Sequence, residues 1–167
     1  MFSTAHAAPV EAEHTTVELI SETDTIVPGE SFDVAIRFKI EPHWHIYWEN
    51  PGASGLATMI DWQLPEGIEA GEIQWPAPER ISMADLVNYG YEDEAVLIVS
   101  MQAAEGLQLG ERLTLQAELF WLICKEACLP GDAQVAIDLL VAEQAVPSAE
   151  SAAFVAARGL QAQPVAP

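Results

Sequence analysis

The sequence predicts an all-β protein, an immunoglobulin-like antiparallel β-sandwich, and three observations lead to this fold class. Apolar and polar residues alternate in several runs, as in residues 31–40, which is the pattern of half-buried strands. Turn signals such as Pro28-Gly29 and Pro65-Glu66-Gly67 separate the runs. No helical pattern lies between them, so antiparallel sheets are expected rather than a parallel sheet with crossover helices.

About eight segments are expected to form strands. Most of them alternate, whereas residues 96–101 form an apolar run of strand length in which Ser100 is the one polar residue. In chain order the expected strands are residues 16–20, 31–40, 43–48, 58–64, 68–75, 96–101, 113–121 and 135–139. Residues 76–94, rich in Pro, Asp and Tyr, fit no strand pattern and are expected to form a long irregular insertion.

We divide the 167 residues into three parts. Residues 1–14 are expected to be a signal remnant or a disordered N-terminus, since Ala5-His6-Ala7 has the small-x-small pattern that precedes a signal cleavage site. Residues 15–146 are expected to form the sandwich domain. Residues 147–167 are expected to hold a short helix over residues 149–158, capped by Ser148 and ended by Gly159, and then a linker to a further domain.

The composition limits the partners that the chain can have. With 26 acidic and 6 basic residues the formal net charge is −20, so the chain cannot neutralise a phosphate backbone and no nucleic-acid partner is expected. Half of the residues are hydrophobic, which is enough to bury a core without a metal. No run approaches the roughly 20 apolar residues that cross a bilayer, so we expect a soluble piece.

The two cysteines, Cys124 and Cys128, follow the apolar end of an expected strand. Four residues apart on an extended strand, their Cα atoms would be roughly 13 Å apart, which is beyond disulfide reach. If they pair, the chain must turn between them. Pro130-Gly131 directly afterwards agrees with a strand that ends in a tight loop.

The chemistry of the residues leaves three interpretations of the cysteine pair open. A redox-active disulfide is favoured, because closing so small a loop stabilises a fold by only about 2 kcal/mol, which a sandwich with this much apolar surface scarcely needs. The second is a structural disulfide in a non-catalytic sandwich. The third is a copper or zinc site in which His43 and His45 join the two thiols, since residues two apart on an expected strand face the same way.

Four motifs follow one another along the chain. They are residues 43–52 (HWHIYWENPG), 74–80 (QWPAPER), 89–92 (YGYE) and 124–131 (CKEACLPG). Together they resemble the N-terminal domain of the thiol:disulfide interchange protein DsbD, in particular the branch that is similar to the ScsB copper-tolerance proteins. The resemblance covers about residues 15–141.

The resemblance implies a periplasmic electron-relay domain of an inner-membrane protein, with Cys124 and Cys128 as its catalytic pair and with no cofactor or metal. Such a domain is part of a thiol:disulfide oxidoreductase and cannot turn over alone. It takes electrons from the thioredoxin-like C-terminal domain of the same protein. That domain receives its electrons through a membrane-embedded domain. It passes them to periplasmic thioredoxin-fold disulfide isomerases or cytochrome c maturation proteins. The ScsB-like branch adds a role in copper tolerance.

The resemblance also implies a cap loop that shields the pair. This loop falls on Asp85, Leu86, Val87, Asn88, Tyr89, Gly90 and Tyr91. The chain departs from the best-known members in that its cysteines are closer together and the aromatic cap residue of those members falls on Asn88. Cys128 is expected to attack the partner and Cys124 to resolve the mixed disulfide, because Cys124 ends an apolar strand whereas Cys128 lies beyond the turn.

Overall fold

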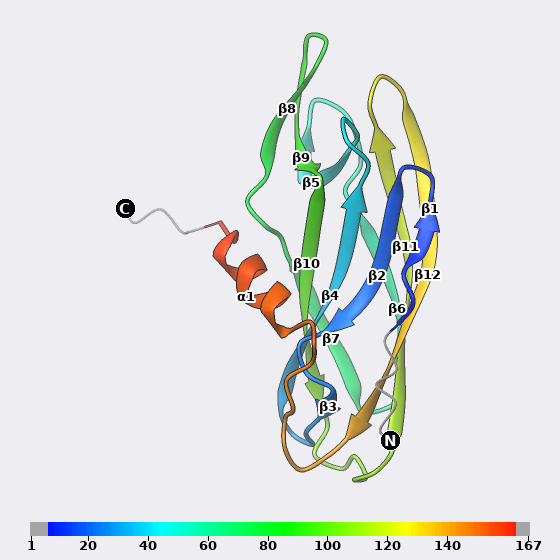
Figure 1. Cartoon of the computed structure of the whole chain (residues 1–167), viewed down its shortest axis with the longest axis vertical. Helices are drawn as coiled ribbons and strands as arrows, with labels where there is room; N and C mark the ends of the chain where they lie inside the picture. Colours follow the sequence, from blue (N-terminus) through cyan, green and yellow to red (C-terminus); the bar gives the residue numbers. More distant parts are fainter. Residues whose placement is uncertain (1–6, 163–167) are drawn as a thin grey trace.

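Two β-sheets pack face to face in the computed structural model, which describes residues 7–162 (Figure 1). The five-stranded sheet has the order β1 (Val10–Ala12), β2 (Thr15–Ser21), β4 (Ser31–Ile40), β10 (Glu94–Ala103) and β7 (Ile68–Gln74). The seven-stranded sheet has the order β3 (Thr25–Ile26), β12 (Cys128–Val141), β11 (Arg112–Cys124), β5 (His45–Gly52), β9 (Leu86–Glu92) and β8 (Glu79–Met83), and β6 (Met59–Gln63) pairs with β11. The predicted all-β, immunoglobulin-like sandwich is confirmed.

Alternation along the strands places one face of each sheet in a shared core. In β4, Ile36 and Phe38 are fully buried, and in β11 Leu119 and Trp121 face them from the other sheet. The rings of Phe38 and Trp121 meet edge to face with their centroids 5.2 Å apart, an arrangement that stabilises a core beyond simple burial. This contact anchors the part of β11 that leads to Cys124.

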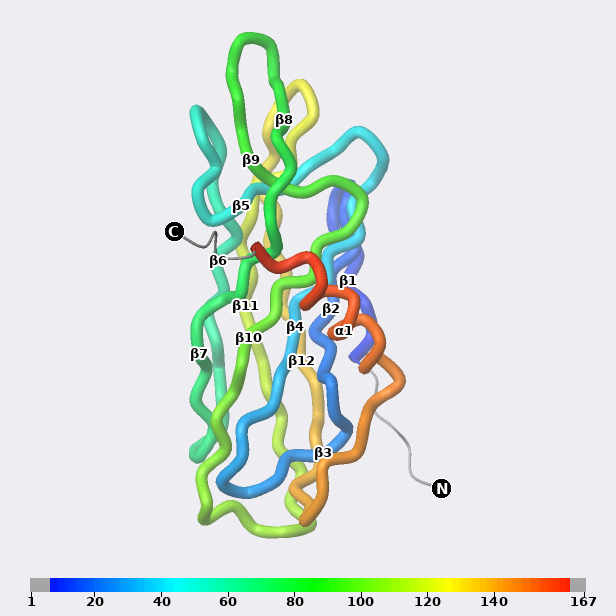
Figure 2. The backbone as a smooth tube through the Cα atoms, turned by 90° about the vertical axis from the view of Figure 1, so that its left-hand side faces the viewer, coloured from blue at the N-terminus to red at the C-terminus, as the bar shows by residue number. Residues whose placement is uncertain are grey.

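Helix α1 (Ser151–Gly159) covers the outer face of the five-stranded sheet (Figure 2). Its Phe154 and Ala157 pack against Val96 and Ile98, which face outward from β10. Because the core covers the other face of β10, this strand is buried on both sides. That burial explains why its sequence is apolar at every position from Val96 to Val99 rather than alternating.

The helix begins later than the sequence predicts, at Ser151 rather than at residue 149. Glu150 is its N-cap residue, and the Ser148 hydroxyl accepts a hydrogen bond from the Glu150 N–H at 3.0 Å in the preceding turn. The Glu150 carboxylate lies 2.7 Å from Arg37, which also pairs with Glu18 at 2.6 Å. This pair of ionic contacts holds the start of the helix on the sheet.

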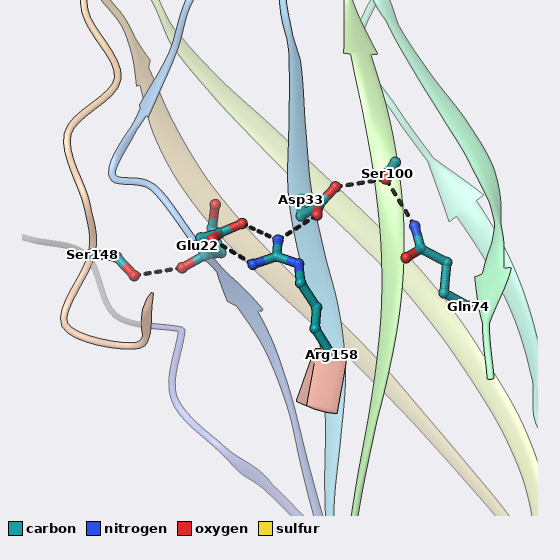
Figure 3. A network of polar contacts seen from close by, with 7 residues as sticks. Glu22, Asp33, Gln74, Ser100, Ser148 and Arg158 are labelled. Atoms are coloured by element: carbon teal, nitrogen blue, oxygen red, sulfur yellow. Dashed lines mark hydrogen bonds and ion pairs between the residues drawn. The ribbon is translucent and has the colours of Figure 1, made fainter. Parts of the chain in front are cut away.

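A second group of polar contacts holds the end of the helix (Figure 3). Arg158 donates to the Glu22 carboxylate at 2.8 Å and to the Asp33 carboxylate at 2.6 Å. Asp33 also accepts a hydrogen bond from the Ser100 hydroxyl at 2.6 Å, which in turn accepts one from the Gln74 side chain at 2.9 Å. The contacts therefore run from α1 across β4 and β10 to β7.

The insertion that was expected to be irregular, residues 76–94, contains a β-hairpin of β8 and β9. Strand β9 extends the seven-stranded sheet by pairing with β5. The alternation of β9 is hidden in the sequence because Asn88 and Gly90, rather than large apolar residues, occupy two of its buried positions. Gly90 is required there, since a Cβ would lie 2.0 Å from the Ile46 carbonyl oxygen in β5.

The sheet also begins earlier than expected, because Val10–Ala12 form β1 and pair with β2 inside the segment assigned to a signal remnant or disorder. Strands β1 and β3 have three and two residues, too few to show an alternation of apolar and polar residues in the sequence. Residues 1–6 of the signal-like segment and residues 163–167 of the expected linker lie outside the described residues. No helix within residues 7–162 has both the length and the apolar character that a membrane crossing requires.

We expect Phe154→Ala to lower the free energy of unfolding by about 3–5 kcal/mol, because the fully buried ring would leave a cavity between α1 and β10. Val155→Ala is the matched control: its side chain is 68% exposed, so the change should stay below about 0.5 kcal/mol. Urea unfolding followed by circular dichroism measures both variants. Small and equal effects would show that α1 does not pack on the sheet.

Candidate active site

The hairpin of β11 and β12 brings Cys124 and Cys128 together. The two strands pair along all 13 residues of β11, and Cys124 opposite Cys128 is the last pair. The two sulfurs are bonded, and the Cα atoms are 4.1 Å apart. Residues 125–127 form the turn that pairing requires, and within it the Lys125 N–H donates to the Ala127 carbonyl at 3.2 Å.

The predicted short turn between the cysteines at the end of the strand is confirmed, but Pro130 and Gly131 lie beyond it, within β12 opposite Leu122 and Trp121. Proline fits because β3 pairs only with the far end of β12, so this part of β12 is an edge that needs no N–H donor. Glycine fits because the Trp121 indole lies over it: a Cβ at position 131 would be 2.3 Å from the indole Cε2. The tryptophan and the glycine therefore fix the hairpin register close to the disulfide.

The two sulfur-bearing residues differ in exposure. Cys124 is fully buried, whereas Cys128 is exposed. In thiol–disulfide exchange a thiolate attacks one sulfur of the bond and the other sulfur leaves, so access selects the attacked sulfur. The geometry favours Cys128 as the attacked sulfur and Cys124 as the leaving one.

Tyr47 of β5 reaches the pair from the neighbouring strand. Its ring is fully buried, and its hydroxyl oxygen lies 3.7 Å from the Cys128 Sγ. The same oxygen lies 3.8 Å from the Met83 Sδ and 3.3 Å from the His45 Nε2. Burial raises the pKa of Tyr47 above its ordinary value of 10.0, so the hydroxyl keeps its hydrogen at neutral pH.

His45 lies on the same face of β5 as Tyr47, because residues two apart on a strand face the same way. Its imidazole is 2% exposed and meets the Tyr47 ring edge-on, with centroids 5.2 Å apart. In the sheet, His45 lies opposite Cys124 of β11 on one side and opposite Glu92 of β9 on the other. Burial lowers the pKa of His45 below 6.5, so the imidazole is neutral at pH 7.

The structure does not place His43 beside His45 as a second metal ligand. His43 precedes β5 and is exposed, and its φ of 73° turns it out of the strand, so the two-residue period does not extend to it. Across residues 7–162, no three His, Cys, Asp or Glu side chains gather closely enough to hold a metal ion. The proposed Cys₂His₂ ligand set is therefore not assembled in the part of the chain that the structure describes.

The loop between β5 and β6 covers the ring of Tyr47. Gly55 of this loop lies so close that a Cβ would be 2.3 Å from the ring carbon Cε1. The loop is held by Asn88 of β9, whose buried Oδ1 accepts hydrogen bonds from the Ser54 N–H at 2.9 Å and from the Ser54 hydroxyl at 3.1 Å. Asn88, expected in a cap loop, therefore secures the loop over Tyr47.

The segment expected to be a cap loop, residues 85–91, is strand β9 with one residue of the turn before it. The β8–β9 hairpin and the β11–β12 turn project from the same end of the molecule (Figures 1 and 2). Met83, which ends β8, is the hairpin residue whose sulfur approaches the Tyr47 hydroxyl. The shielding of Cys124 and Cys128 by residues 85–91 stays a prediction.

Tyr47 and Met83 are the side chains of this group that the sequence analysis did not single out. Tyr47 lies 81 residues before Cys128, and no sequence pattern sets the position of β5 beside the end of β11. A signal was present in the motif of residues 43–52, where two polar rings, His45 and Tyr47, share one face of an expected strand.

Comparison with known proteins gives one family and one fold. Residues 16–140 match the family described as thiol:disulfide interchange protein DsbD, N-terminal. The N-terminal periplasmic domain of ScsB from Proteus mirabilis is similar in fold, with a TM-score of 0.69 and 18% sequence identity. That match covers 95% of this chain and 60% of that chain, so this chain spans about three fifths of the length of the ScsB structure.

The N-terminal domain of DsbD from Neisseria meningitidis, in its reduced form, also matches, with a TM-score of 0.39 and 14% identity over 74% of this chain and 83% of that chain. No curated protein sequence matches this chain.

The burial of His45 predicts a pH dependence of stability. Because the folded-state pKa is lowered, the unfolded chain binds a proton below pH 6.5 that the folded domain does not, so stability is lost as the pH falls from 6.5 toward the lowered value. We expect the wild type to lose up to about 1.4 kcal/mol per pH unit in that window relative to His45→Gln. Urea unfolding between pH 7 and pH 5 measures the difference, and parallel curves for the two proteins would contradict it.

Proposed function

Because the chain belongs to the DsbD N-terminal domain family, we propose that it is the periplasmic electron-relay domain of a disulfide reductase. The fold and the disulfide between Cys124 and Cys128 fit a thiol–disulfide relay. The proposed donor is a thioredoxin-like domain at the C-terminal end of the same protein, supplied by a membrane-embedded domain. The proposed acceptors are thioredoxin-fold disulfide isomerases or cytochrome c maturation proteins, and a role in copper tolerance stays a prediction from the ScsB resemblance.

The observation that carries this proposal is the unequal exposure of the two cysteines in one disulfide. A thiolate of the donor attacks the exposed Cys128 sulfur, and the bond to Cys124 breaks, which leaves Cys124 as a thiolate and Cys128 in a mixed disulfide. The second thiol of the donor then attacks its own mixed-disulfide sulfur and releases Cys128. The donor leaves oxidised and this domain holds two reduced cysteines.

Transfer to the acceptor reverses these steps. The Cys128 thiolate attacks the acceptor disulfide, one acceptor sulfur leaves as a thiolate, and Cys124 then attacks Cys128 to close the disulfide again. Two electrons pass for each domain, and the two thiol protons end on the two acceptor sulfurs. With one dithiol and no dinucleotide-binding motif, the domain relays electrons but does not turn over alone.

The β8–β9 hairpin has a use in this scheme, because an exposed dithiol in an oxidising compartment is open to unwanted partners. The Met83 sulfur lies against the Tyr47 hydroxyl, whose oxygen is also close to the Cys128 sulfur. A partner that docks at this end displaces Met83 and completes access to the bond. Shielding by the hairpin therefore slows small oxidants and reductants more than it slows a docked protein.

Trapping tests the roles of the two cysteines. With a thioredoxin-fold partner disulfide, Cys124→Ala should accumulate a mixed disulfide through Cys128, because the resolving thiol is absent and the exposed thiol remains. Cys128→Ala should accumulate none, because its remaining thiol is buried. Non-reducing gels and mass spectrometry measure the adducts, and an adduct only in Cys128→Ala would exchange the two roles. Adducts in neither variant would overturn the proposed function.

Replacing the hairpin contact tests the shielding. Met83→Ala should speed the reduction of the disulfide by dithiothreitol several-fold, because it removes the side chain that lies against Tyr47 beside the exposed sulfur. Leu109→Ala is the control, since Leu109 is an exposed leucine outside both the hairpin and residues 85–91. Reduction followed by thiol labelling gives both rates. Equal rates in Met83→Ala and the wild type would show that the hairpin does not shield the bond.

A further inference from the structure

A neutral, buried histidine lies two hydrogen-bonding steps from the exposed sulfur. The His45 Nε2 is 3.3 Å from the Tyr47 hydroxyl oxygen, and that oxygen is 3.7 Å from the Cys128 Sγ. His45 is 2% exposed and Tyr47 is fully buried, so water does not compete for the contact between them as it does at a surface. Exchange between sulfurs needs neither side chain, and burying polar groups has a free-energy cost.

We propose that His45 is a positioning residue for the exchange reaction: its Nε2–H donates to the Tyr47 hydroxyl oxygen and so directs the single hydroxyl hydrogen of Tyr47 to the Cys128 thiolate. The inference rests on the proposed function, because a thiolate forms at Cys128 only when the disulfide is reduced.

The direction of the hydrogen bonds follows from counting donors. A tyrosine hydroxyl has one hydrogen, and three acceptors lie around it: the His45 Nε2, the Met83 Sδ and the Cys128 Sγ. If His45 accepts that hydrogen, none is left for the thiolate. If His45 donates, the hydrogen is free for a sulfur, and a thiolate is a stronger acceptor than the thioether of Met83. Only the second arrangement stabilises the thiolate.

The neighbouring charges leave His45 free for this role. The titratable groups next to it are Tyr47 on its own strand, Glu92 on β9, Cys124 on β11 and, through Tyr47, Cys128 on β12; β8 contributes the uncharged Met83. In the described part of the chain, no carboxylate bonds to the imidazole, and burial is the cause of its lowered pKa. The neutral imidazole therefore acts through its N–H rather than through a charge.

The arrangement makes the reduced state more reactive. A hydrogen bond to the thiolate raises the fraction of Cys128 present as thiolate at neutral pH, and the thiolate is the attacking species. Stabilising the reduced form also makes the couple more oxidising. Both effects depend on the Tyr47 hydroxyl, and His45 contributes through it.

The test uses Cys124→Ala as background, so that Cys128 is the single thiol, and records iodoacetamide alkylation from pH 5 to pH 10. We expect Tyr47→Phe to move the midpoint of the pH–rate profile upward and to slow alkylation at pH 7 by about three- to tenfold. His45→Leu should move the midpoint in the same direction. Adding His45→Leu to Tyr47→Phe should change nothing further, because His45 acts through the hydroxyl. His45→Gln should restore the wild-type profile, since its amide N–H₂ can donate to the hydroxyl.

His43→Asn is the matched control, an exposed histidine two residues away whose replacement should leave the profile unchanged. Unfolding curves for each variant confirm that it is folded, and the near-isosteric Tyr47→Phe and His45→Gln keep the test decisive if His45→Leu does not fold. An unchanged midpoint in Tyr47→Phe, additive effects in the double variant, or a failure of His45→Gln to rescue would each overturn the inference. Such a result with normal trapping through Cys128 would leave the proposed function intact.

Discussion

The register of the β11–β12 hairpin is the constraint on which the site depends. Successive residues of a strand face opposite sides of the sheet, so a slip of one residue would separate the cysteines and turn Trp121 out of the core. Trp121 prevents this slip by filling the space over Gly131 on one side and meeting Phe38 in the core on the other. Packing therefore aligns Cys124 with Cys128 independently of the bond between them, and a hairpin that keeps its register can open and close the bond without refolding.

The site combines this hairpin with a loop that covers Tyr47. The loop over Tyr47 is fixed by the Oδ1 of Asn88, while the Nδ2 of Asn88 is buried and has no hydrogen-bond partner among the described residues. An unpaired buried amide group has a free-energy cost of about 1–3 kcal/mol. The strand ladder is thus the fixed element, and displacement of the loop or of the tip of the β8–β9 hairpin by a partner stays a prediction.

The alternation of apolar residues was enough to predict the sandwich and most of its strands, because one face of each strand must enter the core. It missed β9, where Asn88 and Gly90 take buried positions for the sake of a hydrogen bond and of close backbone approach. It misplaced Pro130 and Gly131, which are turn formers in sequence but suit an edge strand beneath a tryptophan. Local patterns do not record which strand lies beside which, so the neighbourhood of Tyr47, His45 and Cys128 appeared only with the fold.

The central claim is that Cys124–Cys128 is an exchangeable disulfide on a fold that does not depend on it. Equilibration of the domain with glutathione or dithiothreitol buffers of graded potential, with thiol labelling and circular dichroism at each step, tests this claim most directly. The account predicts a reversible two-electron transition in the range of thioredoxin-fold dithiols, about −270 to −120 mV, with the β-sheet signal unchanged. A bond that stays oxidised below about −300 mV, or that is reduced only as the sheet signal is lost, would mark a structural disulfide and contradict the account.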